Sequence, residues 1–201
     1  MLQSRNKCVQ QFLDTAYNDL NEHQITVKIY KKRIDNRFDI DGYFDDVSRE
    51  IAIRKNRHWL ETFVYEYAHF LQWKNNDPSF AAYYKCAYNP VRMIEMWLNR
   101  RTPYDRRVKH SFEVVRVNEI QCDKLALHLI RKHSLPINHE NYTRRANRQI
   151  IFYHCVEHKR TWDPSHRFYG KQLCQMIPAN IRTSYAHNIP SRLLQTALEL
   201  F

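Results

Sequence analysis

HWLETFVYEYAHFLQWK, residues 58–74, is the stretch on which the interpretation of this sequence depends. Apolar side chains recur on nearly every side of it, which predicts a buried helix. These side chains are Phe63, Val64, Tyr67, Ala68, Phe70 and Leu71. Glu66 and His69 lie among them, and an ionisable pair in such a place is costly unless a charge, a hydrogen bond or a metal compensates it. A hydrogen bond between the two side chains at i, i+3 is the simplest compensation.

The spacing within this helix indicates a second explanation. Tyr65, Glu66 and His69 match the pattern H-E-x-x-H with the first His changed to Tyr. In the intact pattern, two His at i and i+4 bind zinc from one helical face, and the Glu between them deprotonates the zinc-bound water. We therefore expect Tyr65 and His69 on the same face of one helix.

A site of this kind also needs a carboxylate from a later helix. Residues 111–132, SFEVVRVNEIQCDKLALHLIRK, contain Glu119 on an apolar stripe that is predicted to face the core. The other members of the stripe are Val115, Cys122, Ala126 and Leu129. We expect the carboxylate of Glu119 to approach Tyr65 and His69.

Asp123 follows Glu119 by one helical turn. It is placed to accept a hydrogen bond from His69 and so to orient the imidazole. The alternative is an Asp on the helix surface, paired with Lys124 or Arg116.

These segments together resemble the zincin-like metallopeptidase fold: a strand hairpin, a buried YEYAHFLQW helix, and then NEIQCDKLALHLI. They are similar to small phage-encoded proteins whose helix reads HE-x-x-HFLQW and whose later helix carries E-x-x-C-[DE]-K, and more distantly to ImmA/IrrE-type peptidases. YTRRANRQIIFYHCVEHKRTW, followed by Met176-Ile177-Pro178, resembles the C-terminal extension of those phage proteins. The resemblance covers about residues 38–180.

The resemblance implies a zinc cofactor, with His69 and Glu119 as ligands, Glu66 as general base, and Tyr65 in the position of the first ligand. Because a phenol replaces an imidazole, we expect zinc to be weakly bound or absent and hydrolase activity to be weakened or lost. The expected function is then a binding, structural or regulatory role with a protein partner, in the cytoplasm of an infected host cell or in the virion. The alternative is an active zinc metallopeptidase with an altered ligand set.

The periodicity along the chain predicts an α+β fold in which a small antiparallel sheet packs on a mainly helical domain. We expect one domain over 1–201: an N-terminal helix and the sheet in 1–57, the motif helices in 58–132, and a helical extension in 133–201. The predicted strands are 25–34, 38–44 and 50–54. The predicted helices are 4–21, 58–74, 91–100, 111–132, 139–159 and 190–200.

The formal net charge of +11 lies almost wholly in the C-terminal half, because residues 1–90 contribute +1 and residues 91–201 contribute +10. The basic side chains form two clusters, which fit a nucleic acid, an acidic protein surface, or simply a solvated face. The first cluster is Arg100, Arg101, Arg106, Arg107 and Lys109, and the second is Arg144, Arg145 and Arg148.

Composition excludes other classes of function. Two glycines are too few for the Gly-rich turns of dinucleotide-binding or P-loop enzymes. No stretch approaches the roughly 20 apolar residues of a membrane span, so we expect no membrane association. Five cysteines without a C-x-x-C pair predict free thiols. His154-Cys155-Val156-Glu157-His158 matches the inverted zincin pattern H-x-x-E-H, which is a weak signal among 11 His.

Overall fold

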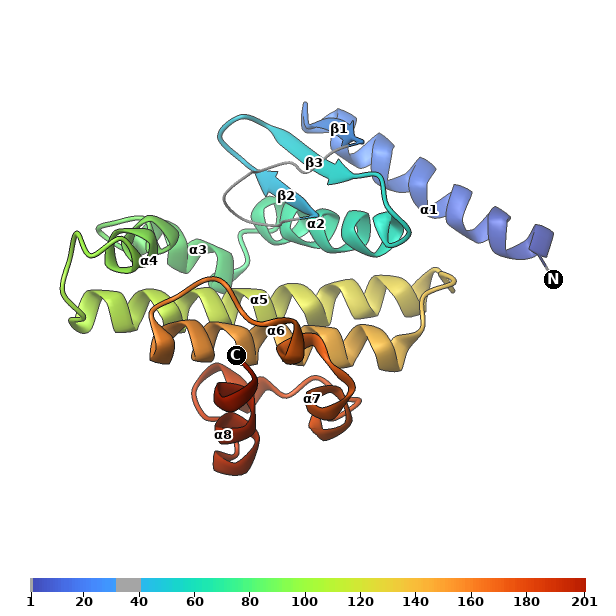
Figure 1. Cartoon of the computed structure of the whole chain (residues 1–201). Helices are drawn as coiled ribbons and strands as arrows, with labels where there is room; N and C mark the ends of the chain where they lie inside the picture. The colour runs from blue at the N-terminus through green and yellow to red at the C-terminus, as the bar shows by residue number, and fades with distance from the viewer. Residues whose placement is uncertain (1, 32–40) are drawn as a thin grey trace. The chain divides into compact units, whose positions relative to one another are not determined.

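Helices account for most of the computed structural model, which describes residues 2–31 and 41–201 (Figure 1). The chain divides into two units, each compact by itself. Unit 1 comprises Met1–Asn76 and Lys124–His139, and unit 2 comprises Asp77–Asp123 and Glu140–Phe201. The α+β class is confirmed. The prediction of a single domain over 1–201 stays a prediction.

The sheet of unit 1 has three strands in the order β1-β3-β2. They are β1 (Thr26–Tyr30), β2 (Gly42–Asp45) and β3 (Glu50–Arg54). The central strand β3 is buried over most of its length, whereas β1 is largely exposed. Residues 32–40, which include parts of the predicted strands 25–34 and 38–44, lie outside the described residues.

The prediction of an antiparallel sheet is wrong for one of its two strand pairs. β2 and β3 are antiparallel, because a short turn that ends at Arg49 joins them directly. β1 is joined to β2 by a longer segment, yet it pairs with β3 and runs parallel to it. A period of two indicates which side chains share a face, but it says nothing about a strand's partner or direction.

Two whole helices belong to unit 1, α1 (Leu2–Glu22) and α2 (Trp59–Lys74), together with a segment from Lys124 to His139. Phe12 of α1 packs edge to face on Phe63 and Tyr67 of α2, with centroids 6.0 and 5.9 Å apart. Asp19 of α1 accepts a hydrogen bond of 2.9 Å from the hydroxyl of Tyr67 and pairs with Lys74. Aromatic packing and one polar cluster thus hold α2 in place.

Unit 2 is helical. It contains α3 (Pro78–Lys85), α4 (Pro90–Leu98), most of α5 (Arg106–Lys132), nearly all of α6 (His139–Lys159), α7 (Lys171–Met176) and α8 (Ser191–Leu200), with 3-10 turns at His166–Tyr169 and Thr183–Ala186. The bounds of α6 agree with the prediction. The short helices α3 and α7 were not predicted, because each spans about two turns and shows little periodicity. The boundary between the units falls within α5, between Asp123 and Lys124.

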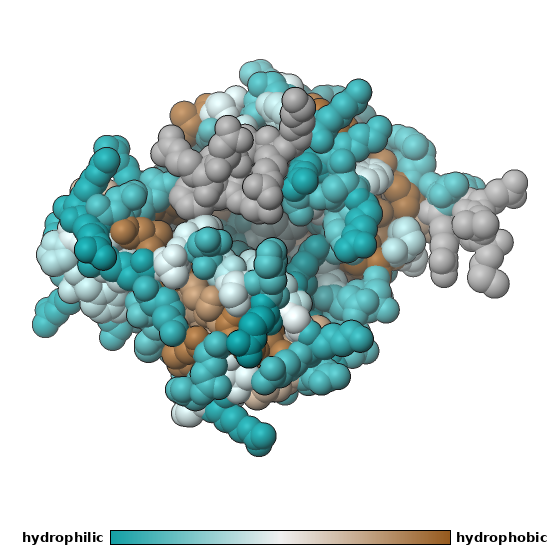
Figure 2. All heavy atoms as spheres, viewed as in Figure 1, coloured by the Kyte–Doolittle hydropathy of each residue, from teal (hydrophilic) through white to brown (hydrophobic). Residues whose placement is uncertain are grey.

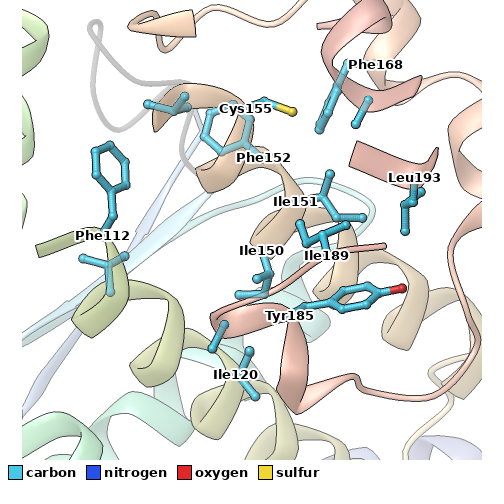
Figure 3. Packing of buried hydrophobic residues seen from close by; sticks show 14 of the residues in the cluster. Phe112, Ile120, Ile150, Ile151, Phe152, Cys155, Phe168, Tyr185, Ile189 and Leu193 are labelled. Atoms are coloured by element: carbon cyan, nitrogen blue, oxygen red, sulfur yellow. The ribbon is translucent and has the colours of Figure 1, made fainter. Parts of the chain in front are cut away.

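The core of unit 2 forms where α5 and α6 pack with the C-terminal segments. Figure 3 shows Phe112 and Ile120 on α5 and Ile150, Ile151 and Cys155 on α6 among these side chains. The C-terminal segment is tied to α6 by polar contacts as well: the Asn147 amide donates to the carbonyls of Pro178 and Asn180 at 3.0 and 2.9 Å. All five cysteines lie in the described residues, and they are free thiols, as predicted.

The surface carries both hydrophilic and hydrophobic side chains. Figure 2 shows hydrophilic residues over most of the face that it presents, with hydrophobic residues between them. Among the described residues, none of the helices has the length and apolarity that a bilayer crossing requires. Large hydrophobic side chains that are exposed include Ile29, Val47, Tyr84, Tyr104 and Tyr169.

Candidate functional site

Helix α2 presents Tyr65 and His69 on one face, as the i, i+4 spacing predicts. The two rings meet edge to face, with centroids 4.9 Å apart and an interplanar angle of 82°. Both side chains are half-buried. A phenol therefore lies beside the imidazole at the position where an intact H-E-x-x-H motif has a second imidazole.

Glu66 lies on the same helix in an apolar environment, and it is only 5% exposed. Its carboxylate accepts a hydrogen bond from the backbone N–H of Phe44 in β2. Burial raises the pKa of this carboxyl to about 8, since desolvation outweighs the single N–H group that favours the charged form. At neutral pH the carboxyl of the metal-free protein is therefore mostly protonated, and in that state it cannot accept a proton from water.

The close approach of β2 to α2 depends on Gly42. A Cβ atom on Gly42 would lie 2.6 Å from Cγ2 of Thr62, 2.9 Å from the carbonyl oxygen of Ala52 and 3.1 Å from Oε1 of Glu66. The first two distances are too short for any side chain, so glycine is the residue that fits between the strand and the helix. This approach brings the N–H of Phe44 to the Glu66 carboxylate.

His69 is oriented by the next turn of its own helix. Its Nδ1 lies 2.9 Å from Oε1 of Gln72, a side chain that is only 1% exposed. An amide oxygen accepts and does not donate, so Nδ1 carries the ring proton and Nε2 is the nitrogen that accepts a hydrogen bond or binds a metal. Burial lowers the pKa of His69 to about 4, which keeps the imidazole neutral at physiological pH.

The donors that α2 supplies do not fit a zinc site of the expected kind. They are one imidazole and one phenol, whereas a catalytic zinc takes three strong protein ligands. A phenol must lose its proton to become a strong ligand, and its ordinary pKa of about 10 makes that costly. The side chains of α2 alone therefore do not make a catalytic zinc site.

Glu119 belongs to unit 2, on α5, and is half-buried. Burial and the neighbouring carboxylate of Asp123 together raise the pKa of Glu119 to about 8. Tyr65, Glu66 and His69 belong to unit 1. The predicted approach of Glu119 to Tyr65 and His69 stays a prediction.

Asp123 is 4% exposed, so the alternative of a surface Asp paired with Lys124 or Arg116 is wrong. Its carboxylate accepts a hydrogen bond of 2.8 Å from the hydroxyl of Tyr142 on α6. Burial raises its pKa to about 7, although this hydrogen bond and the charge of Arg145 act in the opposite direction. The predicted hydrogen bond to His69, which lies in the other unit, stays a prediction.

Several residues around these carboxylates were not predicted. Gln72 stands three residues after His69, and that spacing is a signal that could have indicated the contact. Tyr142 and Tyr153 on α6 have no such signal, because they meet α5 only through the tertiary fold. The charges of Glu119 and Asp123 contribute to a pKa of Tyr153 that is raised well above its usual range, chiefly by burial.

The H-x-x-E-H segment of α6 has structural partners within unit 2. Nε2 of His154 lies 2.7 Å from the carbonyl oxygen of Tyr185, so this nitrogen carries the proton and donates. Glu157 forms a 2.6 Å ion pair with Arg116, and it also accepts a hydrogen bond from the hydroxyl of Tyr104. Both side chains therefore have partners that stabilise the fold of unit 2.

The predicted basic residues differ in their partners. Arg100, Arg101, Arg106 and Lys109 are exposed, whereas Arg107 pairs with Asp105 at 2.7 Å. Arg144 is half-buried and bonds to Glu140 and to the carbonyls of Cys174 and Ile177. The guanidinium groups of Arg145 and Arg148 lie over the rings of Tyr142 and Tyr169, at 5.3 and 5.2 Å.

The two clusters meet α6 at separate places. The first cluster is divided between the segment after α4, which carries Arg100 and Arg101, and the start of α5. This region contacts the end of α6, where the hydroxyl of Tyr104 donates to Glu157 and Arg160 donates to the carbonyl of Trp97 at 2.9 Å. The second cluster ends at Arg148, nine residues earlier on the same helix. That separation corresponds to about 14 Å along the helix axis.

Asp19, Glu22 and His23 form a group whose potential ligand atoms lie within 4.8 Å of one another. Asp19 already pairs with Lys74 and accepts from Tyr67, so it serves to join α1 to α2. These residues were not predicted as a site.

Comparison of the chain with protein-family models, with curated proteins and with solved structures finds no match.

Proposed function

We propose that this chain is a zincin-like protein with a degenerate metal site, and that its role is to bind a protein partner rather than to hydrolyse peptides. The observation that carries the proposal is the edge-to-face contact of Tyr65 with His69 at i, i+4, where the expected site requires a second imidazole. On the resemblance to phage-encoded proteins, the place of action is the cytoplasm of an infected cell.

The electrostatics of Glu66 support the same proposal. A general base must be ionised at the working pH, and the metal-free carboxyl has a pKa of about 8. A zinc ion nearby would favour the carboxylate, but the phenol of Tyr65 makes such an ion weakly held. Loss of the first ligand therefore disables the ligand set and the base together.

The alternative function is that of an active zinc metallopeptidase with an altered ligand set. The geometry of His69 favours it, because the bond to Gln72 directs the lone pair of the ring to Nε2, the arrangement usual for a ligating imidazole. The two proposals differ in the amount of zinc that the protein holds.

The test is elemental analysis of untagged protein purified without chelator, followed by zinc titration of the protein and of Tyr65→His. We expect substoichiometric zinc in the unmodified chain. Tyr65→His should raise zinc affinity by roughly a hundredfold or more, because it restores a strong ligand on a preformed helix. Adding His69→Ala to Tyr65→His should abolish the gain.

Tyr84→His is the matched control, since it introduces an imidazole in place of an exposed tyrosine on α3 of unit 2. It should leave zinc affinity unchanged. One zinc per chain in the unmodified protein, together with zinc-dependent cleavage of casein, would establish the alternative and overturn the proposal.

A further inference from the structure

The segment His166–Lys171 of unit 2 presents an aromatic ring to solvent. Tyr169 is 54% exposed, and its neighbours Arg167 and Lys171 are exposed as well. Phe168, between them, is fully buried and packs edge to face on Phe201 with centroids 5.3 Å apart (Figure 3 shows Phe168 in the core). One buried ring therefore anchors a short segment whose other side chains face outward.

The turn that follows Tyr169 is tight. The N–H of Gly170 donates to the carbonyl oxygen of Arg167 at 2.9 Å. A Cβ atom on Gly170 would lie 2.9 Å from that same backbone oxygen, so a larger residue would force the turn open. Gly170 and Phe168 thus hold the backbone on either side of Tyr169 in place.

Arg148 of α6 reaches the same ring. Its guanidinium carbon lies 5.2 Å from the ring centroid of Tyr169, within the range of a cation–π contact. The side chain is half-buried, and burial lowers its pKa. The other groups that act on its charge are Cys174, Tyr169 and Arg145, and none of them is a carboxylate.

Arg148 differs in this respect from three other arginines of unit 2. Arg107, Arg116 and Arg144 each form an ion pair with an Asp or a Glu. Among the residues that the structure describes, no ion pair is found for Arg148. Residues 140–201 carry nine basic and four acidic side chains, so the surrounding sequence adds to the positive charge rather than balancing it.

We propose that Tyr169 and Arg148 form a binding site for single-stranded nucleic acid, in which a base stacks on the exposed ring of Tyr169 and Arg148, Arg167 and Lys171 contact the phosphates. The combination of an aromatic ring with unpaired basic groups is the one that single-strand-binding surfaces use. A duplex hides the faces of its bases, and an acidic protein has no base to stack, so neither would use the ring.

The test is fluorescence anisotropy with the full chain and a labelled single-stranded DNA of about 16 nucleotides. Tyr169→Ala should weaken binding on the order of tenfold through the loss of stacking. Arg148→Gln should also weaken binding and should reduce the slope of log affinity against log salt by about 0.7, the value for one phosphate contact on a single strand. Arg148→Lys should retain the slope, because it keeps the charge.

Tyr84→Ala and Arg192→Gln are the matched controls, since both residues are exposed in unit 2 and lie outside this segment. Neither should change the affinity. Thermal unfolding of each variant verifies that it is folded.

Two results would overturn the proposal. The first is equal weakening by Arg192→Gln and Arg148→Gln, which would show diffuse attraction of a polyanion. The second is that duplex DNA or polyglutamate binds as tightly as the single-stranded DNA and that Tyr169→Ala does not change the affinity. That result would show that no base stacks on the ring.

Discussion

Helices α2 and α6 carry the same kind of sequence pattern, but their glutamate side chains have different partners. Each has a Glu and a His at a spacing typical of zinc peptidases. On α6, Glu157 is matched by Arg116 and His154 by a backbone carbonyl. On α2, Glu66 receives one backbone N–H and has a pKa raised to about 8.

The partners of a polar group therefore distinguish a structural motif from a candidate site better than the sequence pattern does. Groups that are neutralised by their neighbours stabilise the fold and have little capacity left for a ligand. A buried carboxyl whose charge is not compensated keeps a pKa far from its usual value, which is common at functional sites.

The largest expected effect concerns the ion pair of α6. Arg116 is 3% exposed, and it also donates from Nε to the carbonyl oxygen of Ala186 at 2.8 Å. Arg116→Met should lower the free energy of unfolding by about 3 kcal/mol, because it leaves the carboxylate of Glu157, whose side chain is 13% exposed, without its cation. Urea denaturation of the full chain measures the loss.

The double variant Arg116→Met/Glu157→Leu is the control for this prediction. Replacing a buried ion pair with apolar side chains is often close to neutral, so the double variant should recover most of the lost stability. If Arg116→Met is as stable as the parent, the ion pair of Glu157 has no structural role, and α6 does not differ from α2 in this respect.

The next effect is the pH dependence that Glu66 confers on the metal-free protein. The pKa of its carboxyl is near 4.5 when unfolded and about 8 when folded. The unfolded chain therefore loses this proton first as the pH rises, and stability decreases between about pH 4.5 and pH 8. Each pKa unit corresponds to about 1.4 kcal/mol, so the decrease amounts to a few kcal/mol.

Glu66→Gln removes this titration while keeping the size and polarity of the side chain. With a chelator present, the variant should gain stability relative to the parent as the pH rises from 5 to 8, which urea denaturation at both pH values measures. Parallel pH profiles for the two proteins would mean that Glu66 is neutralised by a charge, as Glu157 is, and would remove the contrast between the helices.

The sequence predicts the helices of the site better than the sheet that supports it. The apolar periodicity of 58–74 and 139–159 is long enough to define α2 and α6 within one residue. The same-face placement of Tyr65 and His69 follows from helical geometry alone. The parallel direction of β1 does not, because it depends on pairing with β3 across an intervening strand of the sequence.

Partners far apart in the sequence also escape prediction. The apolar context of Glu66 predicts its burial, yet nothing near it in the sequence indicates the N–H of Phe44 as its donor. Tyr142 reaches Asp123 from another helix, and Arg116 pairs with Glu157 rather than with Asp123. Charge clusters such as 144–148 reveal composition but not which arginine is already paired.

The smallest expected effect is the pH dependence of His154, and its direction is opposite to that of Glu66. Burial, helped by the charge of Arg116, lowers the pKa of His154 from 6.5 to about 4. The unfolded chain takes up this proton first as the pH falls, so the stabilising contribution is complete above about pH 6.5 and is lost as the pH falls through 4. His154→Gln should therefore lose less stability than the parent between pH 6.5 and pH 4, because glutamine does not titrate and its amide nitrogen can still donate to the carbonyl of Tyr185. His158→Gln, which changes an exposed histidine of the same motif, serves as the control. If His154→Gln and the parent lose stability equally, the fold does not hold the imidazole neutral, and the opposite pH dependences expected of His154 on α6 and Glu66 on α2 are not found.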